Sequence, residues 1–202
     1  MQKPFVLWFF LISLLISQEA YSADKQGQFG VRGAGLISCA LYEQERAAQA
    51  DVYLMTASWV DGYITGINQY SSDTYDILSF ETTELLTSIL SKHCKKHPED
   101  TVFAVLSTLF KKLHNDRLTE LSKKTEVAIG VRKVLLYVEV VKRVQMKLSA
   151  AGFYKRKIDG SYKQSSIDAM KNFQQSIDFN PTGFPDQVTL WRLLRDPENK
   201  TE

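Results

Sequence analysis

Cysteine and histidine are the residues best suited to metal or thiol chemistry in this sequence, and three of them lie around position 94. Cys94 stands between His93 and His97, and the second cysteine, Cys39, lies about 55 residues before it. Thiolates and imidazoles bind zinc, but structural zinc sites space their ligands in short, regular pairs. The irregular spacing here favours neither a metal site nor a bound cofactor, and we expect none.

Carboxylates are the other groups that could do chemistry, and Asp159 and Asp168 are the pair to consider as acid and base. Asp159 precedes Gly160, and an aspartate before a turn glycine commonly accepts a hydrogen bond from its own backbone. The sequence contains no HExxH, GxSxG or Cys–His–Asn arrangement. We therefore predict a structural role for Asp159 and a protein that is not an enzyme.

Residues 1–22 have the features of a secretory signal peptide. Lys3 precedes an apolar run at residues 5–16, and the small residues Ala20 and Ser22 occupy the positions before a cleavage site. The run is short for crossing ~30 Å of hydrocarbon, so an uncleaved anchor is the less favoured alternative. We expect cleavage near Ser22, a periplasmic protein and no stable membrane insertion afterwards.

Export would place both cysteines in an oxidising compartment, where a disulfide between Cys39 and Cys94 is the first hypothesis. Closing a loop of about 55 residues stabilises the folded state by roughly 4 kcal/mol in the chain-entropy account. A reactive thiol is the alternative, but no catalytic partner pattern surrounds either cysteine.

The elements that position these groups begin with three predicted helices in the last quarter of the chain, separated by glycine turns. Apolar residues recur there at helical spacing, and Pro185 is expected to begin the third helix. These positions are Val141, Val144 and Leu148, then Ile167, Met170 and Phe173, then Val188, either Leu190 or Trp191, and Leu194. The pattern predicts a compact helical unit at residues 141–196, followed by a tail at 197–202.

This C-terminal pattern resembles the peptidoglycan-binding domain found on many bacterial cell-wall hydrolases. The motifs that carry the resemblance are Val144-Gln145, Gly152-Phe153-Tyr154, Ile158-Asp159-Gly160-Ser161-Tyr162, Phe173-Gln174, Thr182-Gly183 and Asp186. The resemblance implies a three-helix fold that binds peptidoglycan, with any chemistry placed on another domain. The family usually has glycine at the position of Lys163, so we expect a left-handed Lys163 at a cost of about 1 kcal/mol.

We predict that peptidoglycan contacts come from exposed aromatic and polar groups at the rim of the helices and turns. The candidates are Phe153, Tyr154, Asp159, Tyr162 and Lys163. Gln145, Phe173 and Gln174 are expected to hold the fold instead, with the two glutamines bonded to backbone in the turns.

The rest of the chain is predicted to be a helical bundle at residues 36–117, after a flexible leader at 23–35. Helices are expected near residues 36–53, 55–68, 80–94 and from Pro98, since proline suits the first helical position. Residues 118–140, which are rich in β-branched side chains, are expected to be a linker, extended before Val138 and helical after it.

Part of this bundle is similar to the HdeA/HdeB family of small periplasmic proteins, over roughly residues 35–114. The similarity rests on residues 59–66, Cys94 and Pro98, with Cys39 as the family's first cysteine. It implies a disulfide-tied helical domain and, in the best-known members, an acid-triggered chaperone for unfolded clients. Gly62 and Gly66 are expected to allow close helix packing.

Charge differs between the two parts. Residues 24–116 hold 8 basic and 12 acidic side chains, whereas residues 142–202 hold 11 and 7. A basic C-terminal part favours contact with anionic wall polymers. The run at Lys155 to Lys157 lacks the length and aromatic interleaving of a nucleic-acid site, so we expect no nucleic acid.

The sequence therefore predicts a mainly α protein of two small helical domains: a disulfide-tied bundle and a three-helix domain of the peptidoglycan-binding type. The predicted function is that of an exported, non-enzymatic protein that binds peptidoglycan and presents a partner-binding domain at the cell wall. The alternatives are an acid-stress chaperone with unfolded clients, and an accessory or targeting subunit of a wall hydrolase with a periplasmic protein partner.

Overall fold

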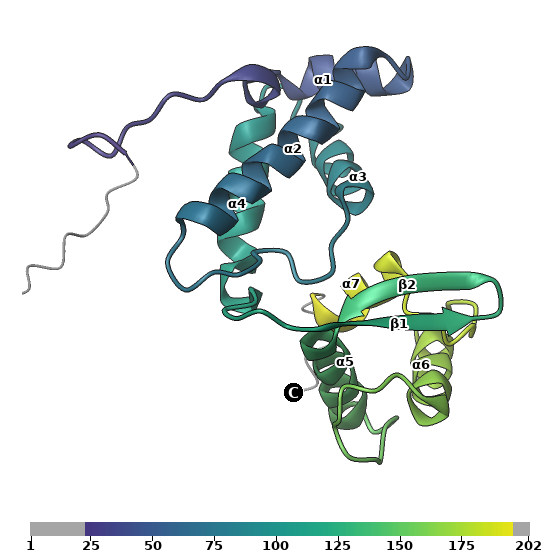
Figure 1. The fold of residues 1–202 in the computed structure, drawn as a ribbon. Helices are drawn as coiled ribbons and strands as arrows, with labels where there is room; N and C mark the ends of the chain where they lie inside the picture. The colour runs from purple at the N-terminus through teal and green to yellow at the C-terminus, as the bar shows by residue number, and fades with distance from the viewer. Residues whose placement is uncertain (1–22, 196–202) are drawn as a thin grey trace, which may run out of the picture. The chain divides into compact units, whose positions relative to one another are not determined.

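The computed structural model describes residues 23–195, so the predicted signal peptide with its cleavage site and the predicted tail lie outside the described residues. The chain divides into two compact units, and the second, which begins at Val31, contains every helix and strand of the described part. Within residues 23–195 there are seven α-helices, two 3-10 helices and one two-stranded sheet. The fold is mainly α, as predicted (Figure 1).

The N-terminal bundle consists of four α-helices and two flanking 3-10 helices. They are η1 (Gly33–Leu36), α1 (Cys39–Ala47), α2 (Asp51–Tyr70), α3 (Thr83–Cys94), α4 (Val102–Leu113) and η2 (His114–Asp116). The hydroxyls of Thr82 and Thr101 accept hydrogen bonds from the backbone three residues later and so cap α3 and α4. Both helices therefore begin later than predicted, and Pro98 lies in the turn before α4 rather than at its start.

The disulfide between Cys39 and Cys94 is present, with an S–S distance of 1.99 Å. It joins the first residue of α1 to the last residue of α3, and both cysteines are buried in the bundle core beside Tyr42, Leu86 and Leu90. This confirms the predicted pairing.

The structure departs from two expectations, one for the end of the leader and one for two glycines of α2. The end of the expected flexible leader forms η1, where a Cβ on Gly35 would lie 2.4 Å from Cζ2 of Trp59, so this segment packs tightly on α2. By contrast, a Cβ on Gly62 or Gly66 would meet nothing within 4 Å among the described residues. These two glycines do not mediate helix packing in this part of the chain.

The expected linker contains a β-hairpin of β1 (Lys124–Ile129) and β2 (Arg132–Tyr137), paired antiparallel with Val127 opposite Val134. The helix α5 begins at Val138, as the sequence indicated. Val127, Leu136 and Tyr137 are buried in the same core as the C-terminal helices. The hairpin is therefore part of that core and not a free connection.

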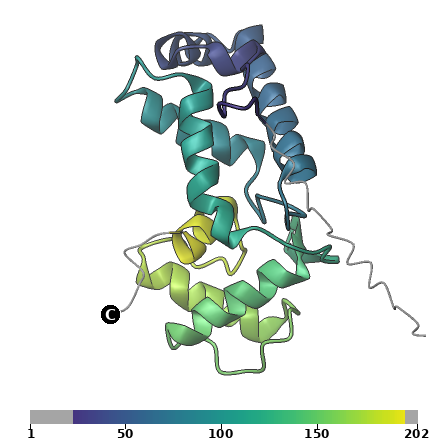
Figure 2. The same cartoon turned by 90° about the vertical axis from the view of Figure 1, so that its left-hand side faces the viewer.

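The C-terminal core is formed by α5 (Val138–Ala150), α6 (Gln164–Ser176) and α7 (Gln187–Leu194), seen below the bundle in Figure 2. Val144, Leu148, Met170 and Leu190 are fully buried in it. The three predicted helices are thus present. The third begins at Gln187 and not at Pro185, because the carboxylate of Asp186 accepts the N–H of Thr189 and caps α7.

Candidate functional site

Gln145 fixes the long loop between α5 and α6. Its side chain is fully buried, and its Oε1 accepts the backbone N–H groups of Asp159 and Gly160 at 3.0 and 2.9 Å. Its Nε2 donates to the carbonyl of Ser161 at 3.0 Å. A buried amide that satisfies backbone groups on both its oxygen and its nitrogen holds an irregular loop in one conformation. This confirms the predicted structural role of Gln145.

Gln174 does the same for the loop between α6 and α7. Its Oε1 accepts from the N–H of Gly183 at 2.7 Å, and its Nε2 donates to the carbonyl of Phe184 at 3.0 Å. The turn glycines are also equivalent: Gly160 and Gly183 have φ values of +73° and +72°, and each faces the first turns of the preceding helix, at Val138 and Ile167. In each of the two loops, therefore, a glutamine side chain bonds backbone groups next to a glycine with positive φ.

Tyr154 lies inside the fold, which corrects the expectation that it is exposed, and Phe153 is half-buried. Tyr154 is 4% exposed, and its hydroxyl donates to the carbonyl of Lys157 at 3.1 Å and accepts from Nε2 of Gln145 at 3.2 Å. Phe153 is half-buried, with its ring edge-on to Phe173 at a centroid distance of 6.3 Å. Residue type alone does not tell a core aromatic from a ligand platform, because both present a large apolar ring.

Asp159 is exposed and occupies the turn position predicted for it. Its Oδ1 accepts the backbone N–H of Ser161 at 2.8 Å and the Nε2 of Gln145 at 3.1 Å. These two hydrogen bonds favour the charged form and hold the pKa of Asp159 below its usual 3.8. Asp168, its proposed acid–base partner, accepts instead from Gln164 on its own helix.

Tyr162 and Lys163 differ in accessibility. The hydroxyl of Tyr162 donates to the carbonyl of Gly183 at 2.9 Å, and burial raises the pKa of Tyr162 above its usual range. Lys163 is exposed and extended, with φ −100°, so the predicted left-handed strain is absent and Gly160 takes that conformation instead. Of the five predicted contact residues, Asp159 and Lys163 alone are exposed.

Residues 138–193 match the family model of the peptidoglycan binding domain. The match spans α5, α6 and all but the last residue of α7, with both glutamine-bonded loops. No curated protein and no solved structure matches the chain. The similarity of residues 35–114 to the HdeA/HdeB family therefore stays a prediction.

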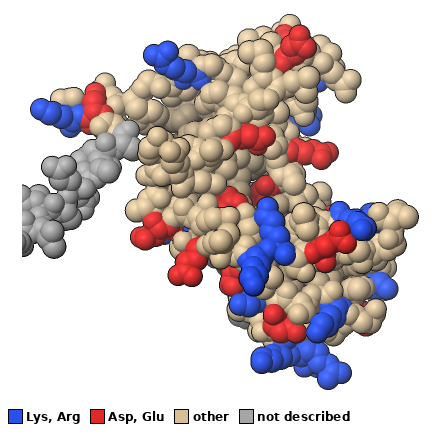
Figure 3. Space-filling view, in the orientation of Figure 1, with Lys and Arg blue, Asp and Glu red and all other residues tan. Residues whose placement is uncertain are grey.

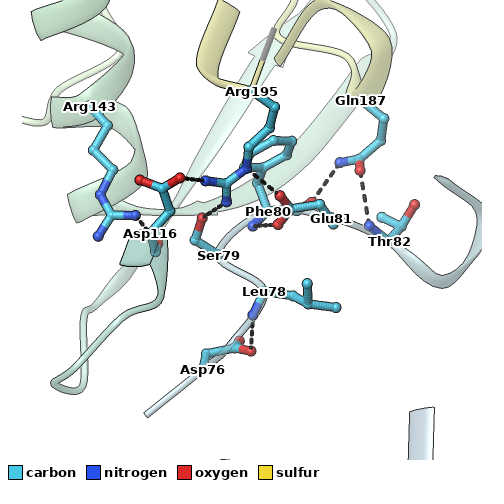
Figure 4. Close-up of polar contacts among 10 residues, drawn as sticks. All are labelled: Asp76, Leu78, Ser79, Phe80, Glu81, Thr82, Asp116, Arg143, Gln187 and Arg195. Atoms are coloured by element: carbon cyan, nitrogen blue, oxygen red, sulfur yellow. Dashed lines mark hydrogen bonds and ion pairs between the residues drawn. The ribbon is translucent and has the colours of Figure 1, made fainter. Parts of the chain in front are cut away.

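The peptidoglycan-binding domain is joined to the bundle by polar contacts, of which the Arg195–Glu81 pair is buried (Figure 4). Arg195, which follows α7, pairs through Nε with Glu81 at 2.8 Å and through Nη1 with Asp116 at 2.6 Å. Gln187 at the start of α7 donates to the carbonyl of Phe80 at 2.8 Å and accepts from the N–H of Thr82 at 3.0 Å. These contacts connect α7 to the segment that leads into α3.

A cavity of about 530 Å³ lies next to this junction, and sequence analysis did not find it. The residues that line it are Ser79, Asn115, Asp116, Arg143, Met146, Lys147, Ala150, Leu194 and Arg195. The only local signal was the placement of Arg143 and Lys147 four residues apart, which puts both cations on one face of α5. The other walls come from distant parts of the chain, so no sequence window contains the site.

The cysteines first considered for metal chemistry form the disulfide, and the histidines contact other side chains. Nε2 of His93 lies 2.6 Å from Oδ2 of Asp100, and the His93 and His97 rings are 4.6 Å apart between centroids. In the part of the chain from residue 23 to 195, no group of three or more His, Cys, Asp or Glu side chains is arranged to hold a metal ion. Over the same residues, no helix has both the length and the apolar character that a membrane crossing requires.

Proposed function

We propose that this is an exported, non-enzymatic protein that binds peptidoglycan through residues 138–193 and holds the disulfide-tied bundle at the cell wall. The family match over these residues carries the proposal. The basic character of this part supports it, since anionic carboxylates and wall polymers would meet a surface of opposite charge. On the face of the molecule that Figure 3 shows, most of the Lys and Arg side chains lie over the C-terminal part.

Within the binding domain, Asp159 and Lys163 are the best candidates for direct contact with the ligand. Both side chains are exposed, Asp159 within the loop that Gln145 holds in place and Lys163 at the end of that loop, and the positive charge of Lys163 helps to lower the pKa of Asp159. Phe153 and Tyr162 would contribute through the edges that remain half-exposed. Tyr154 would act only by shaping the loop.

The bundle is proposed as a partner- or client-binding unit because α2 leaves apolar side chains uncovered in the described part of the chain. Leu54 and Met55 are 60% and 61% exposed, and the backbone at Gly62 and Gly66 is open to approach. A chaperone-like function and an accessory function beside a wall hydrolase both use such a surface. They differ in the partner: an unfolded client in the first case and a folded enzyme in the second.

Co-sedimentation with insoluble peptidoglycan tests the binding proposal. The chain from residue 23 should pellet with the polymer, and Lys163→Glu should reduce the pelleted fraction because Lys163 lies at the proposed rim. Lys111→Glu, on α4 of the bundle, makes the same charge change away from the rim and should pellet as the unaltered chain does. Protein that stays wholly in the supernatant would rule out the proposed function.

Two further assays separate the alternatives. Release of soluble muropeptides from purified wall by the chain alone would make the protein an enzyme and contradict the non-enzymatic proposal. Suppression of client aggregation at strongly acidic pH, with none at neutral pH, would favour the chaperone alternative over the accessory subunit.

A further inference from the structure

The cavity beside Arg195 has the size and lining of a small-ligand site. Its volume of about 530 Å³ falls within the range of ~300–1,000 Å³ that is usual for such sites. One wall is α5, which contributes Arg143, Met146, Lys147 and Ala150, and the opposite side comes from the bundle with Ser79, Asn115 and Asp116. Both parts of the chain are therefore needed to form it.

Positive charge predominates in this lining. The guanidinium of Arg195 is paired with Glu81 and Asp116, so it adds little net charge. The guanidinium of Arg143 donates to the main-chain carbonyls of Asp116 and Arg117, which hold it in position without neutralising its charge (Figure 4). Lys147 is exposed one helical turn further along α5. A positioned guanidinium beside an exposed ammonium favours a carboxylate ligand.

The rest of the lining is aliphatic and small. Met146 is 44% exposed, and Ala150 and Leu194 complete an apolar surface next to the two cations. A ligand that matches both features carries carboxylates together with methyl-sized side chains. A sugar chain offers mainly hydroxyl groups and matches this lining less well than a short acidic peptide does.

We propose that this cavity binds the acidic stem peptide of peptidoglycan, with its carboxylates at Arg143 and Lys147 and an alanine methyl group against Met146 and Leu194. The proposal rests on the proposed function and names the part of the polymer that is recognised. The matched family segment ends at residue 193 and does not include Ser79, Asn115, Asp116 or Arg195. The cavity is accordingly a feature of the junction in this chain.

The experiment compares two insoluble polymers in co-sedimentation: intact peptidoglycan and chitin, a polymer of N-acetylglucosamine that carries no stem peptides. The full chain should pellet well with the first and at least several-fold less with the second. Lys147→Glu should lower pelleting with intact peptidoglycan on the order of tenfold, because it replaces attraction by repulsion at the carboxylate. Lys92→Glu on α3, another exposed lysine but one outside the cavity lining, should leave pelleting unchanged.

A second readout is a titration of the full chain with a synthetic stem tetrapeptide, followed by NMR shifts of the Met146 methyl group. Saturable shifts that Lys147→Glu weakens support the proposal, provided circular dichroism shows an unchanged melting temperature. Equal pelleting with both polymers and no saturable shift overturn the stem-peptide site and leave the proposed function standing. Failure to pellet with either polymer, again with no saturable shift, overturns both.

Discussion

Nε of Arg195 lies 2.8 Å from Oε1 of Glu81, although the two residues are 114 positions apart in the chain. The side chains are only 5% and 0% exposed, and the Arg195 guanidinium also lies over the ring of Phe80 at 5.2 Å from its centroid. Because both groups are removed from water, neither charge can lose its partner at low cost, since solvent cannot take the partner's place. The bundle and the peptidoglycan-binding domain are consequently held together by a specific charge contact as well as by the covalent chain.

Replacing Arg195 by methionine should destabilise the protein strongly. The substitution keeps most of the aliphatic volume but leaves the carboxylate of Glu81 buried without its cation. Removing one partner of a buried pair costs about 3–5 kcal/mol. The free energy of unfolding, measured by urea denaturation, should fall by that amount.

The control for this prediction is the double variant Glu81→Leu with Arg195→Met. Because it removes both charges, it leaves only the carboxylate of Asp116, which is 55% exposed and can be hydrated. The double variant should therefore be more stable than Arg195→Met alone. A double variant that loses more stability than the single one would show that the pair itself, and not the unpaired charge, determines the cost.

Gln145→Leu should destabilise the peptidoglycan-binding domain by about 2–5 kcal/mol, because the part-buried N–H of Asp159 and the buried N–H of Gly160 would lose their acceptor. Gln164→Leu is the matched control, since Gln164 is exposed and its side chain bonds only to Asp168 among the contacts described. It should change stability by no more than about 0.5 kcal/mol. Similar losses in the two variants, measured by thermal unfolding, would contradict the role given to Gln145.

Alanine substitutions at two turn glycines should differ in cost for a steric reason. Gly152 and Gly160 both have positive φ, but a Cβ on Gly152 meets nothing within 4 Å, whereas one on Gly160 would lie 2.5 Å from Cγ1 of Val138. Gly152→Ala should therefore cost about 1–2 kcal/mol for the backbone alone. Gly160→Ala should cost a further 1–3 kcal/mol for the clash. Equal melting temperatures for the two variants would mean that the loop relaxes freely around Gly160.

Local patterns were sufficient to predict much of the fold. The helical spacing of apolar residues located α5, α6 and α7, and the two cysteines left one pairing to consider. Helix starts were less well predicted because they depend on which side chain accepts a hydrogen bond from the first turn of the helix. Thr82, Thr101 and Asp186 each accept a backbone N–H, and each moves the start of its helix past the expected position.

Features that depend on distant contacts were not predicted. The β-branched residues of the hairpin indicated extended structure, but only packing against α5 shows that Val127 and Leu136 belong to the core. Tyr154 was expected at the rim and is buried because its hydroxyl finds partners inside the loop. The cavity and the Arg195–Glu81 pair bring together residues from both halves of the chain, so no local pattern could have revealed them.

Replacing both cysteines by serine should lower the free energy of unfolding by roughly 4 kcal/mol, because the disulfide closes a loop with a sequence separation of 55 residues. The two half-cystines lie in the bundle core, away from the glutamine-bonded loops. Pelleting with peptidoglycan at a temperature where the variant remains folded should therefore equal that of the unaltered chain. Lost pelleting under those conditions would show that the bundle itself contacts the polymer.

The turn at Asp159 should lose stability in acid. The hydrogen bonds from Ser161 and Gln145 hold the pKa of Asp159 below 3.8, so the folded state binds this proton less readily than the unfolded chain does. For a carboxyl with a lowered pKa, the stabilisation is complete above the unfolded value and is lost as the pH falls through the folded value. The loss should therefore occur below about pH 4. NMR titration of the Asp159 carboxyl should give a midpoint under 3.8, and Asp159→Asn should destabilise the protein at neutral pH more than in acid. A midpoint at or above 3.8 would mean that the two hydrogen bonds do not favour the charged form.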